Sequence, residues 1–250
     1  CAIHSVGYTD RYFIAILQLG GYRDPMRSTS TTSARLIQQS RPPLADGDFI
    51  CNTTTGEVFR LTGGAPVYVS TWTVFGGGRP CREMTGDEIS ALPQYPADGS
   101  YLRDPVSGAI YRVAGGAPIY ISSVAGLGGG SPAVDIDPAA IDRAAGGGPY
   151  DHLRIYPADG TFLRGAKDGA IYRVAGGAPL YVTSWTGLSG GPAVDVDTAA
   201  IDFAGLGGYF NHLRYRPADG TFLRGAKDGA VYRVAGGAPL YVSTWSAFAG

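Results

Sequence analysis

One twelve-residue phrase, repeated four times, constrains this chain more than any other feature. The phrase reads VFRLTGGAPVYV from Val58, IYRVAGGAPIYI from Ile110, IYRVAGGAPLYV from Ile171 and VYRVAGGAPLYV from Val231. The Gly-Gly steps at its centre are separated by 52, 61 and 60 residues, and an Asp-Gly step precedes each phrase with the same separations. A unit repeated in this way cannot bury its faces alone, so neighbouring units must pack on it.

Each unit predicts three short strands. In the last copy these are residues 221–224, 231–234 and 240–242, which are apolar runs of strand length. Lys227-Asp228-Gly229 predicts the first turn, and Gly236-Gly237 predicts a two-residue hairpin loop because glycine readily adopts positive φ angles. That loop places Tyr232 opposite Tyr241. The same aromatic pairing is expected in the other copies: Phe59 with Tyr68, Tyr111 with Tyr120, and Tyr172 with Tyr181.

Short helical turns are expected after the third strand of each unit. A Ser or Thr ahead of an i, i+3 apolar pair is typical of a capped turn, as at Trp72, Val124, Trp185 and Trp245. Further turns are predicted by N-caps at Asp137, which precedes a proline, and at Asp197, and by a capping box of Thr85 and Glu88.

These signals predict a mainly β chain of four tandem repeats, each a three-stranded meander with short helical turns. Residues 1–30 form an N-terminal segment with one apolar strand, and residues 31–250 form the repeat domain, divided near 31–80, 81–132, 133–192 and 193–250. A β-propeller-like ring is preferred over a linear row of small modules because a ring leaves few edges exposed. A propeller blade usually has four strands, which weakens this preference.

Composition excludes several functional classes. The formal net charge of −1 argues against a nucleic-acid partner. No apolar run reaches the ~18 residues that cross a bilayer, so no transmembrane segment is expected. The sequence contains no catalytic or phosphate-binding motif and predicts neither an enzyme nor a cofactor. Cys1 is compatible either with the lipidated first residue of a bacterial lipoprotein or with a simple chain boundary.

Cys51 and Cys81 both lie in the first unit and have no counterpart in the others. A disulfide between them would close a loop of about 30 residues and stabilise the fold by roughly 3–4 kcal/mol. Two unrelated thiols are the alternative. The bond is favoured, and it fits an exported protein.

Candidate ligand-binding residues recur in equivalent positions of the last two units. The polar candidates are Asp159, Arg164, Lys167 and Asp168 in the third unit, Asp219, Arg224, Lys227 and Asp228 in the fourth, and the equivalent His152 and His212. A turn-forming role competes for the Asp-Gly aspartates, and a structural role for the histidines.

Two other patterns favour structural roles. Asp135 with Asp137 and Asp195 with Asp197 form Asp-x-Asp pairs that would suit calcium, but helix capping already explains one member of each. Trp72, Trp185 and Trp245 would suit sugar stacking, but their i, i+3 apolar partners favour a wedge in the core. No metal site is therefore predicted.

The phrases PADGTFLRGAKDGAVYRVAGGAPLYVSTW and VDVDTAAID resemble tandem repeats of exported actinobacterial proteins, which often accompany cell-wall or hydrolytic domains. The resemblance covers the chain from about residue 31 to the end. It implies an accessory module that is extracellular or at the bacterial cell surface. It implies no defined activity and no functional residues.

Three functions remain open. The first is a non-enzymatic, lectin-like binding module for cell-envelope glycans, with equivalent sites on several units. The second is an assembly component that docks to another protein through a repeat face or through the strand from Tyr12 to Leu19. The third is an accessory domain of a cell-wall hydrolase.

Overall fold

The computed structural model describes residues 42–124, 126–127 and 132–247. Its internal contacts divide the chain into Cys1–Pro42 and Pro43–Gly250, and the fold below is that of the second unit. Cys1, the strand expected from Tyr12 to Leu19 and the start of the first repeat near residue 31 lie outside the described residues.

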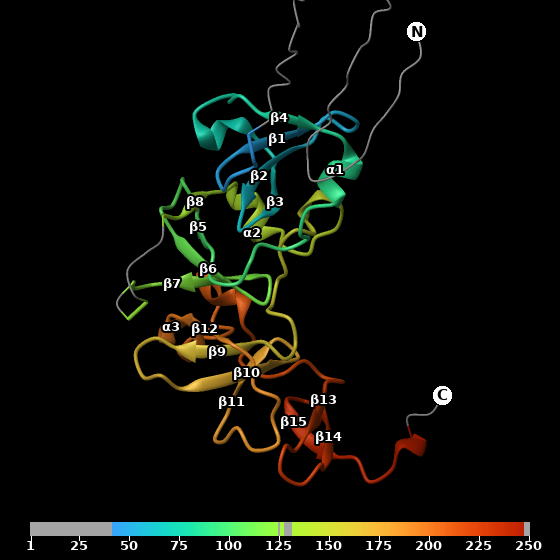
Figure 1. Ribbon diagram of the computed structural model, residues 1–250. Helices are drawn as coiled ribbons and strands as arrows, with labels where there is room; N and C mark the ends of the chain where they lie inside the picture. The colour runs from blue at the N-terminus through green and yellow to red at the C-terminus, as the bar shows by residue number, and fades with distance from the viewer. Residues whose placement is uncertain (1–41, 125, 128–131, 248–250) are drawn as a thin grey trace, which may run out of the picture. The chain divides into compact units, whose positions relative to one another are not determined.

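The described chain is mainly β and contains four small sheets, each numbered after the repeat that supplies its first three strands (Figure 1). Sheet 1 consists of β1 (Phe49–Asn52), β2 (Val58–Thr62), β3 (Ala65–Val69) and β4 (Arg82–Met84). Sheet 2 consists of β5 (Tyr101–Arg103), β6 (Ile110–Ala114), β7 (Ala117–Ile121) and β8 (Val134–Asp135). Sheet 3 consists of β9 (Phe162–Gly165), β10 (Ile171–Ala175), β11 (Ala178–Tyr181) and β12 (Ala193–Val196). Sheet 4 consists of β13 (Phe222–Arg224), β14 (Val231–Ala235) and β15 (Ala238–Tyr241).

The Gly-Gly hairpin and its register are confirmed in all four repeats. Gly236 and Gly237 have φ angles of 59° and 77°, so both residues need the left-handed region that glycine tolerates. Tyr232 pairs with Tyr241 across the strands, and their ring centroids lie 5.8 Å apart. The other three pairs have the same register and edge-on geometry.

Sheets 1, 2 and 3 each contain a fourth strand that the expected three-stranded meander lacks. β4, β8 and β12 each lie parallel to the first strand of their sheet, giving the order β3-β2-β1-β4 and its equivalents. Residues 134–135 are too short to be recognised as a strand, and a parallel partner requires a crossover that no local turn signal announces. In sheet 4 the described residues supply three strands.

The helical turns follow their predicted caps. α1 (Gly86–Ser90) begins at the Thr85–Glu88 capping box, and α2 (Pro138–Asp142) and α3 (Thr198–Asp202) begin at Asp137 and Asp197. The 3-10 helices are η1 (Trp72–Phe75), η2 (Gly148–Tyr150), η3 (Gly208–His212) and η4 (Trp245–Ala247). None of the helices in the described part of the chain is long and apolar enough to span a bilayer.

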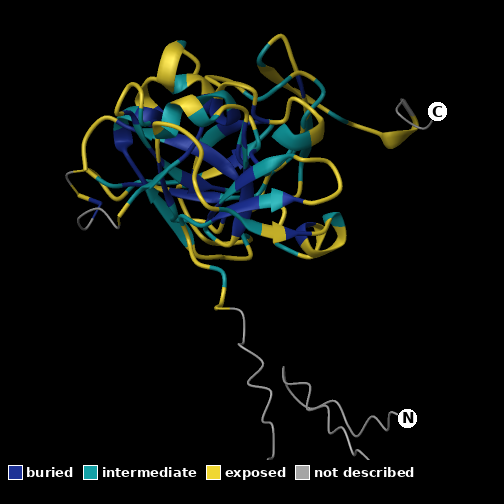
Figure 2. Cartoon of the chain, turned by 90° about the horizontal axis from the view of Figure 1, so that it is seen from above, coloured by how far each residue is buried: buried dark blue, intermediate teal, exposed yellow. Residues whose placement is uncertain are grey.

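The core is divided among the repeats. Buried residues concentrate in the strands (Figure 2). The first strands of sheets 1 to 3 contribute the fully buried Ile50, Leu102 and Leu163. The main clusters combine a sheet with the helix that follows its fourth strand, for example Leu102 with Ile136 and Ile141. The described residues form no closed barrel or propeller.

The predicted disulfide is confirmed between Cys51 on β1 and Cys81, which precedes β4. Cys51 lies opposite Glu83 in the β1–β4 ladder. In sheets 2 and 3 the positions of Cys51 and Glu83 are held by an arginine and an aspartate that form an ion pair, Arg103 with Asp135 and Arg164 with Asp195. In sheet 1 a disulfide therefore links the first strand to the residue that precedes the fourth strand. In sheets 2 and 3 an ion pair links the first strand to the fourth.

Candidate binding surface

The Gly-Gly hairpin is one half of the joint between consecutive repeats. The carbonyl oxygen of Gly115 accepts a hydrogen bond from the Ala158 N–H in the Pro-Ala-Asp-Gly turn of the next repeat, at 3.0 Å. A Cβ atom at Gly115 would lie 2.3 Å from Thr161 Oγ1 and 2.8 Å from the Ala158 nitrogen. The same contact joins Gly63 to Ala97 and Gly176 to Ala218. Each of the first three copies of the phrase therefore fits the turn that follows it.

Two connectors reinforce these joints: connector 2 is residues 132–156 and connector 3 is residues 192–216. Each supplies the fourth strand of its own sheet and also covers the aromatic pair of the preceding sheet. In connector 2, Tyr150 lies against Tyr68 with ring centroids 5.0 Å apart. In connector 3, Tyr209 stacks on Tyr120 at 4.7 Å. A connector therefore touches two sheets at once.

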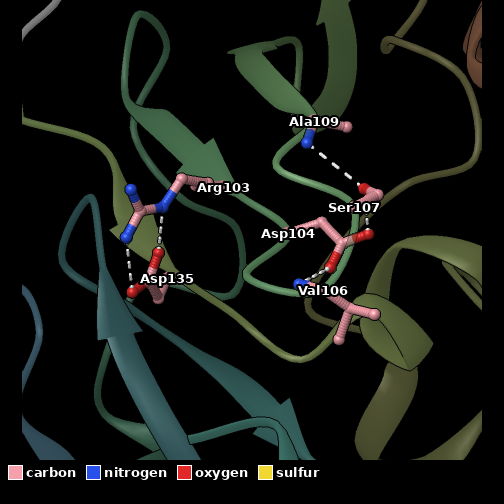
Figure 3. A network of polar contacts seen from close by, with 6 residues as sticks. All are labelled: Arg103, Asp104, Val106, Ser107, Ala109 and Asp135. Carbon is pink, nitrogen blue, oxygen red and sulfur yellow. Dashed lines mark hydrogen bonds and ion pairs between the residues drawn. The ribbon is translucent and has the colours of Figure 1, made fainter.

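The Asp-x-Asp pairs perform this double contact. The first aspartate binds within its own sheet, as Asp135 does with the guanidinium of Arg103 (Figure 3). The second aspartate caps the connector helix and reaches the preceding repeat. Asp197 Oδ2 accepts hydrogen bonds from Ser122 N at 2.7 Å, Ser122 Oγ at 2.6 Å and Ser123 N at 3.0 Å. Asp137 binds Ser70 and Thr71 in the same way.

Electrostatics agree with these roles. Burial alone would raise the pKa of Asp197, but the hydrogen bonds from Ser122, Ala199 and Ser123 outweigh burial and lower it. The hydrogen bond from the arginine lowers the pKa of Asp135 and of Asp195. These carboxylates are ionised partners of protein groups. The part of the chain that the structure describes contains no cluster of three or more His, Cys, Asp or Glu residues suited to a metal ion.

The two equivalent histidines have structural surroundings. His152 Nδ1 lies 2.9 Å from the carbonyl oxygen of Gln94, and His212 Nδ1 lies 2.9 Å from that of Ile155. His212 is buried against Tyr111, and burial lowers the pKa of its imidazole. Both rings fix the connector to the preceding repeat.

Several polar candidates have partners elsewhere in the chain. Arg164 is paired with Asp195, and the backbone N–H of Lys167 donates to Thr198 Oγ1. Asp219 accepts from Gly237 N at 3.1 Å, and hydrogen bonds from the hairpin N–H groups lower its pKa. Asp168 and Asp228 accept from the backbone N–H two residues ahead, and Lys227 lies exposed beside Asp228.

The second repeat shows why Asp168 belongs to a turn. There the acidic residue is Asp104, which accepts hydrogen bonds from Val106 N and Ser107 Oγ, while Ser107 Oγ accepts from Ala109 N (Figure 3). In the third repeat glycine replaces Asp104 and Asp168 replaces Ser107. A Cβ atom at Gly165 would lie 2.4 Å from Asp168 Oδ1. Each of the two turns therefore holds one carboxylate at the same place, that of Asp104 in repeat 2 and that of Asp168 in repeat 3.

Two of the predicted residues meet across a joint. Asp159 of repeat 3 and Arg224 of repeat 4 line one cavity of about 560 Å³, together with Arg173, Tyr181 and Phe222. The sequence analysis did not select the last three. The recurrence of arginine after the first aromatic residue of every phrase was an available signal, because this arginine lies over the first-strand aromatic ring in each repeat.

Repeats 3 and 4 expose apolar surface that repeats 1 and 2 bury. On the third strand, Val67 and Ile119 are each 1% exposed, whereas their counterpart Leu240 is 57% exposed. Tyr181 and Tyr241 are exposed as well, because the described chain has no connector over sheets 3 and 4. This region, with the cavity beside it, is the candidate binding surface.

The tryptophans stand beside this surface. Trp185 contacts Phe162 at 5.0 Å between ring centroids, and Trp245 contacts Phe222 at 5.3 Å. Each ring packs on the first strand of its sheet, as a wedge would, yet both tryptophans remain about half exposed. They combine a structural contact with open aromatic surface.

No family model, curated protein or solved structure matches the chain.

Proposed function

We propose that this chain is a non-enzymatic assembly module, in which stacked repeats form a scaffold and repeats 3 and 4 present the binding surface. One observation carries the proposal: a cavity of about 560 Å³ lies between repeats 3 and 4, and apolar residues beside it are exposed in the described chain. The pairing β9–β12 has no counterpart at β13 among the described residues, and Leu240 and Tyr241 are open to solvent. Exposed apolar patches of this kind mark interaction sites.

The ligand class best supported is polypeptide. Wherever an equivalent surface is covered in this chain, a strand and a short helix cover it, with tyrosine rings on the aromatic pair. An extracellular or cell-surface location accords with the Cys51–Cys81 disulfide, since such bonds persist in oxidising compartments. The resemblance to repeats of exported actinobacterial proteins supports the same location.

We propose an open row of repeats in place of the ring preferred from the sequence, since the described sheets form no closed ring. Hydrogen bonds in the described chain join sheet 2 to the segments that follow it, as between Gly115 and Ala158 and between Ser122 and Asp197.

Glycan binding is the second candidate function. The half-exposed rings of Trp185 and Trp245 and the polar groups of Asp159 and Arg224 at the cavity favour it. Aromatic faces beside a few polar groups are a common arrangement in ligand sites. An accessory role beside a cell-wall hydrolase is compatible with either ligand.

Co-sedimentation with actinobacterial cell walls tests the proposal. We expect the protein to bind intact walls and to lose binding after the walls are treated with protease. Leu240→Asp should weaken binding about tenfold, since it places a charge on the exposed apolar strand. Leu206→Asp is the matched control, because Leu206 is 73% exposed but lies in connector 3, away from this surface.

Retention on protein-free walls, reversed by soluble wall glycans, would replace the proposal with the glycan function. Equal binding by Leu240→Asp and Leu206→Asp would show that the candidate binding surface takes part in neither protein nor glycan binding.

A further inference from the structure

We infer that a cavity between sheet 2, α2 and η3 is a binding site for a primary alkylammonium group, the chemistry of a lysine side chain or of a free aliphatic amine. The cavity has a volume of about 390 Å³ and lies between repeat 2 and the two connectors. All the residues that line it lie well inside the described part of the chain. The inference is independent of the proposed function, because none of these residues belongs to the candidate binding surface.

Two buried side chains at this cavity have a polar atom without a partner. Tyr111 is 4% exposed and His212 is 8% exposed, and their ring centroids lie 6.2 Å apart in an edge-on arrangement. Neither the Tyr111 hydroxyl nor His212 Nε2 forms a hydrogen bond with any of the described residues. Buried polar atoms normally have partners, so two such atoms at one cavity point to a ligand that supplies hydrogen bonds.

The tautomer of His212 determines which kind of hydrogen bond the ligand must make. Nδ1 lies 2.9 Å from the carbonyl oxygen of Ile155, and since that oxygen can only accept, Nδ1 carries the proton. Burial lowers the pKa of the imidazole, so the ring is neutral near pH 7. Nε2 therefore offers a lone pair, and a ligand that meets it must be a hydrogen-bond donor.

Two carboxylates add negative charge to the lining. Asp104 is 8% exposed, and its oxygens accept hydrogen bonds from Val106 N and Ser107 Oγ, which leaves further lone pairs on both oxygens (Figure 3). Asp142 forms no hydrogen bond or ion pair with the described residues. No lysine or arginine lines the cavity. The lining therefore favours a cation over a phosphate or a carboxylate.

The cation that fits is an organic one. The described His, Cys, Asp and Glu side chains form no cluster of three suited to a metal ion. Burial, together with the nearby Tyr209, Asp104 and Asp142, raises the pKa of Tyr111, so its hydroxyl stays neutral and its oxygen can accept. The cavity thus offers acceptors of three kinds: an imidazole nitrogen, a phenol oxygen and carboxylates.

An alkylammonium group matches this lining in charge and in hydrogen bonding. Its three N–H donors match the three kinds of acceptor. The rings of Tyr111 and Tyr209, whose centroids lie 6.4 Å apart, supply aromatic surface that attracts cations. A methylene stem would lie along Pro138 and Ile141, as lysine stems do on apolar surfaces. The cavity volume is in the range of small-ligand pockets.

Repeat 1 provides a natural comparison, because connector 2 places His152 against it as connector 3 places His212 against repeat 2. His152 Nδ1 also lies beside a carbonyl oxygen, and its ring centroid is 5.6 Å from that of Phe59. The two carboxylates and the hydroxyl have no equivalents there. Asp104, Tyr111 and Asp142 correspond to Asn52, Phe59 and Ser90. The joint forms without these groups, which favours a binding role for them in repeat 2.

Titration of the full chain with n-butylammonium chloride, followed by NMR, tests this inference. We expect saturable shifts of the Tyr111 and His212 side-chain signals and no shift at His152. Butan-1-ol lacks the charge and tetramethylammonium lacks the N–H donors, so each should bind at least tenfold more weakly. Nα-acetyl-lysine amide separates the two sources: tighter binding than butylammonium assigns the site to a lysine side chain, and weaker binding assigns it to a free amine.

Matched variants of the full chain test the residues. Tyr111→Phe and Asp142→Ser give these positions the side chains of repeat 1, and each should weaken butylammonium binding at least fivefold. Asp202→Ser, at the equivalent position of connector 3 and outside the lining, should leave binding within about twofold. Tyr111→Phe keeps the buried ring and Asp142 is exposed, so both variants should fold.

Four results would overturn the inference: no saturable binding of butylammonium, shifts confined to residues outside the lining, equal binding of butan-1-ol, or equal effects of Asp142→Ser and Asp202→Ser.

Discussion

Repeats 3 and 4 differ at one residue over their central 26 positions, Ile171 against Val231, yet their surfaces differ greatly. Both form the same hairpin with the same register, and their aromatic centroid distances are 5.6 and 5.8 Å. Ala178 on β11 is buried, whereas all four residues of β15 are exposed. Local sequence therefore determines the hairpin, and the next neighbour along the chain determines what the hairpin buries.

The largest expected effect is on the aromatic pairs. Tyr111, beneath connector 3, is 4% exposed, and Tyr111→Ala should lower the free energy of unfolding by about 3–4 kcal/mol because it leaves a cavity. Tyr232→Ala, at the same position of repeat 4, should cost about 1 kcal/mol, since no connector in the described part of the chain covers that ring. Urea unfolding followed by circular dichroism measures both values. Equal losses would show that burial in the two repeats is the same.

Loss of the disulfide should be next in size and confined to repeat 1. Cys51→Ser with Cys81→Ser should cost about 3–4 kcal/mol, because the bond restrains a loop of 30 residues in the unfolded chain. Hydrogen exchange should show faster opening of β1 to β4 and unchanged protection of β9 to β12. Arg103→Ala, which removes the ion pair at the equivalent position of sheet 2, should have a much smaller effect. Faster hydrogen exchange in sheet 3 as well would contradict an array in which the loss of stability stays within one repeat.

The hairpin glycines give a matched test of docking. Gly115→Ala and Gly236→Ala both place alanine at a φ angle near 55°, which costs about 1 kcal/mol in each. Gly115→Ala should cost a further 1–3 kcal/mol, because its Cβ would meet the backbone of Ala158, whereas nothing lies within 4 Å at Gly236. Thermal unfolding of the two variants measures the difference. Identical melting temperatures for the two variants would show that the contact between Gly115 and the next repeat does not contribute to stability.

Acid should weaken the contacts that the connector aspartates make within their sheets and with the preceding repeat. The folded-state pKa values of Asp135, Asp195 and Asp197 lie below the usual value near 4, so their contribution is fully present above about pH 4 and is lost as the pH falls through the depressed values. Asp197→Asn should cost about 1–2 kcal/mol at pH 7 and reduce the acid sensitivity. The exposed Asp202→Asn is the control. Melting temperatures between pH 7 and pH 2.5 test this, and parallel pH curves for wild type and Asp197→Asn would contradict it.

Much of the fold could be predicted from the sequence because its determinants are local. The glycines of the hairpin, the caps at Thr85, Asp137 and Asp197, and the register of the tyrosines all act within about ten residues of chain. The disulfide could be predicted because only two cysteines shared a repeat.

The candidate site was less accessible from the sequence. Asp159 and Arg224 were selected as ligands and do line one cavity, but Tyr181 and Phe222 beside them were not selected. The histidines and the turn aspartates were selected for their chemistry, which the fold uses for hydrogen bonds within the chain. The missing information is which donors and acceptors the neighbouring repeat supplies, and that neighbour lies more than fifty residues away.

The sequence by itself determined the unit: its turns, its register, its helix caps and its covalent bond, since each depends on the preferences of a few adjacent residues. The tertiary structure decided the rest. A parallel strand completes each of three sheets, and within each Asp-x-Asp pair the first aspartate binds its own sheet while the second binds the preceding repeat. The described chain also covers the aromatic pair of sheet 2 and leaves Tyr241 of sheet 4 exposed. The physical reason is that burial and ion pairing belong to two surfaces in contact. Residues 162–165 and 222–225 are identical, and only the segment that lies against them separates a buried strand from an exposed edge.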